Sequence, residues 1–322
     1  MNKIFYKVMM MATVVTMLCA CEYKDLAEPD SLRNMKRFTV KYEWDNVDSI
    51  PGSMRVAFYP KDFILNKQGY TFFDITNDET EIELPVGHYD VTSWNNDIEH
   101  VITDGFELQT SLYATTGNYS PHGNAAIPKV LDSLYNGQRV LDYPDYMVHA
   151  NRLDFVLEDN GKGNILTLTP DSMVVTMEIR LKGIAGLEWC RNCRGAINNI
   201  AAKRLMAYSN LTQELATIMY DGKWNAADST VTAQFWIFGI EPSEMSQLQH
   251  KVVFFFWLDG GQVFLPLDVT NSVARHSKDE KYILIESPQL DIDLKKYMKN
   301  GGTGMQVTAD DWEEGENISL DF

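Results

Sequence analysis

The chain has 322 residues, of which 45% are hydrophobic and 11% are aromatic. This content predicts packed cores and excludes a disordered chain, and the length is enough for two domains of ordinary size. The formal net charge is −17 at pH 7. We therefore expect no nucleic-acid partner, and an anionic lipid surface would repel the chain.

The N-terminus has the organisation of an export signal. Lys3 and Lys7 form a short cationic lead, and the uncharged apolar stretch 8–18 follows. This stretch is shorter than the about 20 residues of a membrane-spanning helix, but it matches the apolar region of a signal peptide. Residues 18–21, Leu-Cys-Ala-Cys, match the bacterial lipobox, whose last cysteine receives diacylglycerol through its sulfur. We predict a cleaved lipoprotein signal over 1–20 and lipidation of Cys21. The alternatives are an ordinary cleaved signal or an N-terminal anchor helix.

Residues 21–35 are largely polar, acidic behind Cys21 and without apolar periodicity, so we expect a tether between the lipid and the folded body. Several acyl chains on Cys21 would make the attachment effectively permanent. An acidic segment directly after the lipid-bearing cysteine resembles the surface-export signal of Bacteroidota lipoproteins. The resemblance implies an outer-membrane protein, lipid-anchored and exposed at the cell surface.

From residue 37 onward the dominant period is two, which is typical of half-buried strands. Phe38, Val40 and Tyr42 alternate with polar residues, and residues 85–87, Pro-Val-Gly, form a turn. Short strands with frequent turns predict an antiparallel sandwich. A short helix is expected over 127–134. The strands expected in this half are 38–44, 54–59, 70–73, 81–84, 88–94, 99–102 and 154–157.

Residues 159–163 are a run of turn formers, so we place a domain boundary there and expect domains over 36–160 and 161–322. Residues 184–206 have apolar side chains at roughly helical spacings and predict a short helix or an irregular crossover. Residues 254–257, Phe-Phe-Phe-Trp, predict a central strand covered on both faces, with a binding patch as the alternative. The strands expected in this half are 165–168, 173–181, 231–238, 252–258, 263–265, 282–285, 306–308 and 317–322.

Cys190 and Cys193 are the only cysteines beyond Cys21. Their spacing occurs in zinc and redox motifs, but zinc needs four ligands, and no second pair or close histidine lies nearby in the sequence. A thioredoxin-type site needs a βαβ unit, which the pattern does not indicate. The pair could close a small disulfide in an oxidising compartment, or remain two thiols in a loop.

No catalytic motif stands out, so we expect a protein that is not an enzyme and that has no cofactor or metal site. The sequence has no Gly-x-Ser-x-Gly elbow, no His-Glu-x-x-His pair and no phosphate-binding loop. Residues 310–316 hold five carboxylates but lack the alternating ligands and central glycine of an EF-hand calcium loop. A solvated acidic turn is the preferred interpretation.

Asp-Ser pairs recur along the chain, mostly followed by an apolar residue. They resemble the short acceptor sequence for protein O-glycosylation in Bacteroidota, which predicts that some of these serines carry glycan. The alternative is turn and capping chemistry, for which Asp and Ser are well suited. The serines are Ser31, Ser49, Ser133, Ser172 and Ser229.

A series of motifs along the chain resembles a known family. Residues 84–91, Leu-Pro-Val-Gly-His-Tyr-Asp-Val, are followed by the Trp-Asn-Asn-Asp segment at 94–97. Proline would end one strand, glycine would permit the reversal, and Tyr89 would enter the core on the next strand. Further matching segments are 186–187, 194–196, 200–201, 235–239, 258–260, 267–270 and 310–313. In this order they resemble the Bacteroidota fimbrillin-associated anchor lipoprotein family and related Bacteroides surface lipoproteins of the same two-domain type.

The resemblance implies an all-β fold of two tandem transthyretin-like antiparallel β-sandwich domains, with one or two short helices, after the cleaved signal. It implies a lipid-anchored cell-surface protein that acts as the anchor or an accessory subunit of a fimbrium. Its partners would be outer-membrane lipid through Cys21 and fimbrial subunits through β-strand addition. A polymerising shaft subunit would have a basic processing site ahead of its first strand, and this sequence shows none; Arg37, adjacent to that strand, is the only candidate. A lipid-retaining anchor therefore fits better than a shaft subunit.

Two other classes of function stay open. The alternative is a surface glycan-binding lipoprotein that serves nutrient uptake, in which exposed tryptophans would stack on sugar rings. A surface hydrolase is a weaker third hypothesis. The tryptophans, most of which we expect in a core, are Trp44, Trp94, Trp189, Trp224, Trp236, Trp257 and Trp312.

Overall fold

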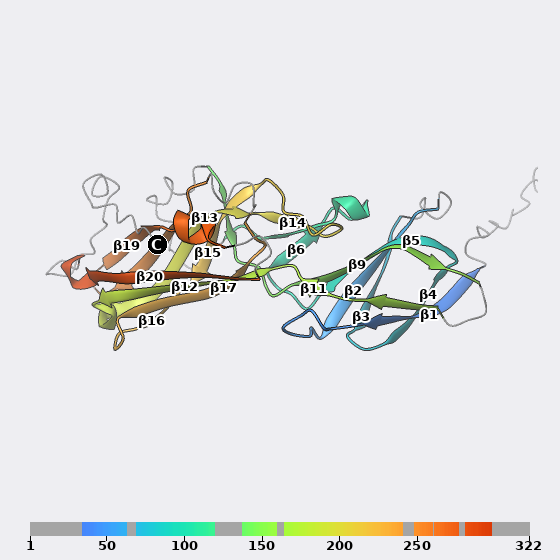
Figure 1. Ribbon diagram of the computed structural model, residues 1–322, viewed down its shortest axis with the longest axis horizontal. Coiled ribbons are helices and arrows are strands. Elements are labelled where there is room, and N and C mark those ends of the chain that lie inside the picture. The colour runs from blue at the N-terminus through green and yellow to red at the C-terminus, as the bar shows by residue number, and fades with distance from the viewer. Residues whose placement is uncertain are drawn as a thin grey trace, which may run out of the picture.

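The computed structural model describes residues 34–62, 69–119, 137–159, 164–240, 248–259, 261–276 and 281–297. They form two β-sandwiches that lie end to end along the long axis of the molecule, with a small sheet near their junction (Figure 1). Helices in this part of the chain are confined to single short turns. The expected all-β fold of two sandwiches is confirmed.

The first sandwich packs a five-stranded sheet, in the order β11-β9-β5-β2-β3, against a three-stranded sheet, β10-β1-β4. Neighbouring strands are antiparallel except β1 and β10, which are parallel. Its strands are β1 (Met35–Tyr42), β2 (Ser53–Pro60), β3 (Thr71–Thr76), β4 (Thr80–Pro85), β5 (Gly87–Asn95), β9 (Val148–Leu157), β10 (Asn164–Leu168) and β11 (Asp171–Ser172).

The alternation seen in the sequence places one side of each strand in the core of this sandwich. Phe38 and Val40 of β1 are 2% and 0% exposed, whereas Arg37, the residue before Phe38, is exposed. The ring of Phe38 meets Phe58 of the facing sheet edge to face, with centroids 5.8 Å apart at 87°. This geometry is one that aromatic pairs prefer. The period of two therefore reports burial correctly here.

The Leu-Pro-Val-Gly-His-Tyr segment forms the corner where the chain passes from one sheet to the other. β4 belongs to the three-stranded sheet and β5 to the five-stranded sheet. Tyr89 is 2% exposed, and its hydroxyl donates a hydrogen bond of 2.7 Å to the carbonyl of Pro85. The proline ends β4, and the tyrosine fixes the corner from inside the core, as the motif predicts.

The second sandwich packs the sheet β16-β17-β12-β20 against the five-stranded sheet β19-β18-β13-β15-β8. Two pairs, β12 with β20 and β15 with β8, are parallel. Its elements are β8 (Arg139–Asp142), β12 (Val175–Ala185), η3 (Leu187–Trp189), β13 (Cys190–Ala201), β15 (Leu215–Asp221), β16 (Lys223–Asn225), β17 (Thr230–Ile237), β18 (Lys251–Leu258), β19 (Gly261–Asp268), α5 (Thr270–Ala274), β20 (Tyr282–Asp293) and η4 (Leu294–Tyr297).

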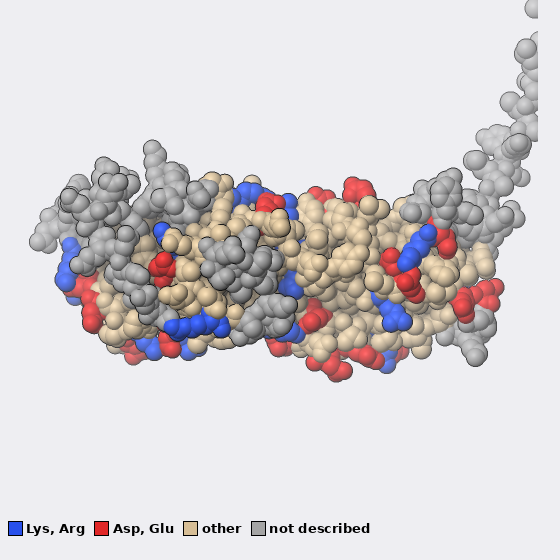
Figure 2. Space-filling view, turned by 45° about the horizontal axis from the view of Figure 1, so that its top comes forward, with Lys and Arg blue, Asp and Glu red and all other residues tan. Residues whose placement is uncertain are grey.

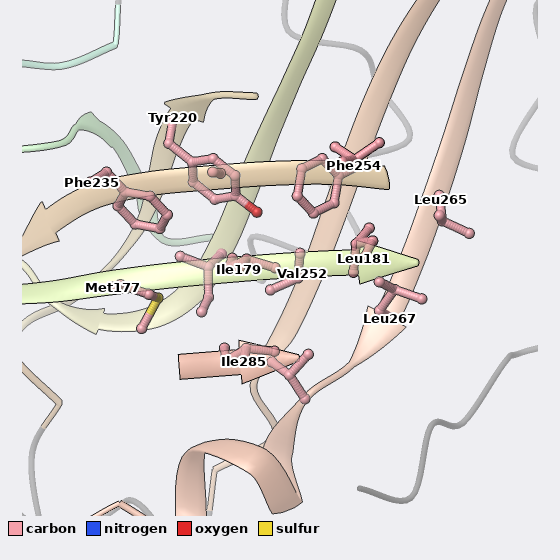
Figure 3. Packing of buried hydrophobic residues seen from close by; sticks show 14 of the residues in the cluster. Met177, Ile179, Leu181, Tyr220, Phe235, Val252, Phe254, Leu265, Leu267 and Ile285 are labelled. Atoms are coloured by element: carbon pink, nitrogen blue, oxygen red, sulfur yellow. The ribbon is translucent and has the colours of Figure 1, made fainter. Parts of the chain in front are cut away.

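Figure 3 shows the core between these two sheets, where Met177, Ile179 and Leu181 of β12 project toward the facing sheet. Phe254 of β18 lies in this core and is 0% exposed. Phe255 belongs to a separate buried cluster on the opposite face of its sheet and is only 1% exposed. The Phe-Phe-Phe-Trp segment is therefore a strand covered on both faces, as predicted.

A small third sheet lies where the sandwiches meet. It has the order β14-β7-β6. Arg204 of β14 donates hydrogen bonds to the carbonyls of Met173, at 2.6 Å, and Phe238, at 3.2 Å. Met173 lies where the chain passes from the first sandwich to the second, and Phe238 follows β17, so one guanidinium joins both bodies. The elements here are β6 (Val101–Asp104), η1 (Gln109–Ser111), β7 (Tyr113–Thr116) and β14 (Lys203–Leu205).

Two sequence-based expectations are wrong. Residues 184–206 form strands β13 and β14 and the short turn η3 where we expected a helix or crossover. The sheets also do not divide at 160/161, because β10 pairs with β1 of the first sandwich while β8 pairs with β15 of the second. Each sandwich is completed by a strand from the other side of the expected boundary.

Several expectations fall outside the described residues. They are the signal and most of the tether, the helix over 127–134, the strands over 306–308 and 317–322, and the acidic segment 310–316. Within the described residues, no helix is long and apolar enough to cross a membrane. On the face shown in Figure 2, acidic and basic side chains are interspersed over both ends of the body.

Candidate functional site

The predicted lipidation site, Cys21, lies outside the described residues, as do Ser31, Ser133 and Trp312. The first described strand, β1, begins at Met35 and lies at the end of the molecule remote from the second sandwich (Figure 1). A lipid-bearing tether would therefore join the body at the far end of the first sandwich.

Cys190 and Cys193 are free thiols in the structure, so the disulfide considered for this pair is not formed there. They lie on strand β13 and not in a loop, and both belong to the core of the second sandwich. A register shift between Cys190 and Asn192 lets both side chains reach the same core. Burial raises the pKa of the Cys190 thiol to about 11 and that of Cys193 further. Two protonated, buried thiols are poor nucleophiles.

The three described serines of the glycosylation pattern differ in accessibility. Ser49 is exposed, whereas Ser172 and Ser229 are half-buried. The hydroxyl of Ser172 donates a hydrogen bond of 2.7 Å to the carbonyl of Val174. Ser229 has a positive φ of 53° and lies in the turn between β16 and β17. Ser49 is the described serine most open to modification.

The described tryptophans are largely taken up by packing. Trp94 is 1% exposed, and Trp189 is the exception at 41%. The remaining ones are half-buried against core clusters, namely Trp44, Trp224, Trp236 and Trp257. Apart from Trp189, the described tryptophans therefore offer no exposed platform for sugar stacking.

A hollow of about 270 Å³ lies where β8 ends beside β13 and β15. Polar and aromatic side chains from five separate segments converge on it. The lining residues are His100, Tyr119, Asp142, Tyr143, Arg194, Met219, Tyr220 and Asp221.

Arg194 forms one wall of the hollow. Arg194 on β13 and Asp221 on β15 are register partners, and their side chains form an ion pair with Nε 3.0 Å from Oδ1. The guanidinium also donates a hydrogen bond to the hydroxyl of Tyr119 and lies 5.8 Å from the centroid of its ring. The ion pair with Asp221 and the cation–π contact with Tyr119 hold the Arg194 side chain in place.

His100 also lines the hollow, and its ring contacts Asp145. The His100 ring, through Nδ1, is 2.8 Å from Oδ1 of Asp145, and the backbone amides of Glu99 and His100 both donate to Oδ2. The hydrogen bond to Asp145 raises the pKa of His100. The carboxylate thus fixes the position of the imidazole and favours its protonated form.

Tyr143 lines the hollow beside His100. Its ring packs against His100 on one side and Phe235 on the other, with both centroid distances at 6.4 Å. Burial, together with the negative charges of Asp221, Asp145 and Asp142, raises the pKa of Tyr143. Its hydroxyl therefore stays protonated and can donate a hydrogen bond at neutral pH.

Sequence reasoning did not bring these residues together. The lining side chains come from strands and loops whose pairing was not predicted. Among the described residues, no three His, Cys, Asp or Glu side chains converge as a metal site would require. The hollow supplies hydrogen-bond donors and acceptors in a fixed frame, which suits binding.

Comparison with known proteins shows the family. A family model described as "Domain of unknown function (DUF5119)" matches residues 20–221, which is more than half of the chain. The chain belongs to this family. The matched region covers the first sandwich and a large part of the second, so the family is not defined by either sandwich alone.

Two proteins of Bacteroides ovatus are similar to this chain over nearly its whole length. A protein of Bacteroides ovatus named "Putative fimbrium anchoring subunit Fim4B" is 24% identical over an alignment of 358 positions, and the alignment covers 98% of each chain. The crystal structure of a "putative adhesin" from Bacteroides ovatus matches 92% of this chain and 97% of its own, with a TM-score of 0.61 and 19% identity. The likeness to fimbrial anchor proteins that the motifs predict is confirmed.

Proposed function

We propose that this chain is a lipid-anchored cell-surface protein that holds or supports a fimbrium, with a structural and not a catalytic role. The observation that carries the proposal is the alignment with the relative named as a fimbrium anchoring subunit, which covers 98% of both chains. Because the match runs through both sandwiches, it concerns the whole architecture and not a single shared domain.

The shape of the molecule supports this role. Strand β1, which directly follows the acidic tether, lies at one end of the long axis, and most of the second sandwich lies at the other (Figure 1). Lipid on Cys21 would fix the first sandwich to the outer membrane and hold the second sandwich away from it. The polar contacts of Arg204 between the two bodies would keep them from separating under tension.

The second sandwich offers sheet edges for a partner. β19 and β20 are edge strands of its two sheets, and among the described residues no further strand pairs with the open edge of either. A strand from a fimbrial subunit could add to such an edge by backbone hydrogen bonds. Pro266 within β19 lacks an N–H and would limit addition to the residues before it.

The proposal is tested by recovering the native protein from bacterial membranes after mild chemical cross-linking. An antibody against this chain should recover it together with fimbrial subunits, and intact-mass analysis should show acyl chains on Cys21. A matched strain expressing the same body behind an ordinary signal peptide should release the protein from the membrane. Recovery of an unmodified chain without any fimbrial subunit would contradict the proposal.

A further inference from the structure

We propose that the hollow between His100, Tyr143 and Arg194 binds a neutral saccharide unit. This goes beyond holding a fimbrium, because it gives the chain a small-molecule recognition site of its own. The site lies in the second sandwich beside the junction, where β8, β13 and β15 contribute lining residues, and is independent of the sheet edges at β19 and β20.

The size of the hollow restricts the ligand. Pockets for small molecules span roughly 300–1,000 Å³, so a hollow of about 270 Å³ is at the small end. It suits a ligand of one or two sugar rings, or the terminal residue of a longer glycan that continues into solvent. Met219 and the tyrosine rings give apolar surface against which the C–H face of a pyranose can lie.

The charges in the hollow favour a neutral ligand. Arg194 is paired with Asp221, and His100 is paired with Asp145. An added anion would have to compete with the Asp221 carboxylate for Arg194, and Asp142 contributes further negative charge at the lining. Phosphate and sulfate groups are therefore disfavoured.

The mixture of donors and acceptors favours hydroxyl groups. Arg194 supplies N–H donors, Asp221 supplies carboxylate acceptors, and the hydroxyls of Tyr119 and Tyr143 can do both. Each sugar hydroxyl also donates and accepts, so a ring presenting several of them can satisfy neighbouring groups of both kinds. A lysine or arginine side chain of a ligand has only donors, so it could pair only with the acceptors of the hollow. It would also lie close to the positively charged guanidinium of Arg194.

The side chains are fixed before any ligand arrives. Asp145 accepts from two backbone amides and contacts the His100 ring, and the Tyr143 ring packs between His100 and Phe235. Since these rotamers are already set, little side-chain entropy is lost on binding. Such a supporting shell distinguishes a built site from an incidental gap between loops.

The test is a titration of the full mature chain, monitored by saturation-transfer NMR, with methyl α-mannoside, methyl β-galactoside and N-acetylglucosamine as probes. We expect at least one to bind with a Kd of about 1 mM or tighter. Tyr143→Phe keeps the ring packing, removes the hydroxyl, and should weaken binding about 3- to 10-fold. Tyr282→Phe, which removes an exposed tyrosine hydroxyl bonded to Glu178 on the other sheet, is the matched control and should leave the Kd unchanged.

Two results would overturn the proposal. One is the absence of binding by all three probes at about 10 mM, tenfold above that Kd. The other is binding that Tyr143→Phe and Arg194→Gln both leave unchanged. A lysine-rich peptide that binds in place of the sugars, and is lost in Asp221→Asn, would assign the hollow to a basic protein partner instead. A failure of sugar binding would not contradict the proposed attachment of a fimbrium, because cells carrying Tyr143→Phe should still hold their fimbriae.

Discussion

Replacing Arg204 with methionine tests whether the junction between the sandwiches is held by one side chain. The guanidinium donates to the carbonyls of Met173 and Phe238, in addition to the carbonyl of Ser209 near its own strand. Met173 and Phe238 are 0% and 2% exposed, so water cannot readily replace the lost donor. Two buried acceptors without a partner cost about 1–3 kcal/mol each.

Methionine also relieves the burial of a charge, which offsets part of this loss. We therefore expect Arg204→Met to lower the free energy of unfolding by about 2–4 kcal/mol, measured by urea titration with tryptophan fluorescence. The matched control is Arg180→Met, since Arg180 is an exposed arginine paired with Glu178 on the surface of the second sandwich. Such surface pairs contribute at most about 1 kcal/mol. Equal losses in the two variants would refute the role assigned to Arg204.

Three further outcomes are expected. Burial lowers the pKa of His149 from 6.5 to about 4, so between these values the unfolded chain binds more protons than the folded chain. The free energy of unfolding should fall by up to about 3 kcal/mol as the pH drops from 6.5 to 4. If the urea midpoint of His149→Gln depends on pH as steeply as that of the wild type, this prediction is contradicted. In Gly195→Ala the new methyl group overlaps the ring of Tyr220, which already stacks on a neighbouring ring at 4.1 Å. Overpacking should lower the free energy of unfolding by about 1–3 kcal/mol in the same assay. A change near zero would contradict this and show that the Tyr220 ring can move. Cys190 and Cys193 should resist a thiol reagent in the native chain and react fully in urea without reductant; two unreactive cysteines in urea would instead reveal a disulfide.

The fold was largely predictable where strands alternate regularly. Phe38, Val40 and Tyr42 of β1 are all buried, and the Pro85–Tyr89 corner has the geometry that its residues favour. In such segments, local burial and the final sheet agree, because each strand has one face in a core. The motif order then added what periodicity cannot supply, namely that two sandwiches follow one another.

Strand β13 was missed for a physical reason. Its pairing shifts register between Cys190 and Asn192 and again between Ile197 and Ile200, where Asn199 has a positive φ of 58°. Extra residues at these irregularities break the period of two and leave apolar side chains three apart, which imitates a helix. A pattern search cannot distinguish a twice-irregular strand from a short helix.

The hollow could not be predicted because its side chains come together only through long-range pairing. Arg194 meets Asp221 through the pairing of β13 with β15, and Asp142 joins them through the parallel pairing of β8 with β15. His100 reaches the same place from the segment before β6. No spacing within the sequence signals such a meeting, in contrast to the lipobox, whose chemistry is contained in four consecutive residues.

The central claim is that this chain fixes a fimbrium to the cell. Its most direct test is to delete the gene in the parent bacterium and measure how fimbrial protein divides between washed cells and culture medium. We predict that fimbriae move from the cells to the medium, and that the wild-type gene, but not a version lacking Cys21, the proposed lipidation site, restores them to the cells. Fimbriae that stay on the deletion cells in wild-type amounts would contradict the account.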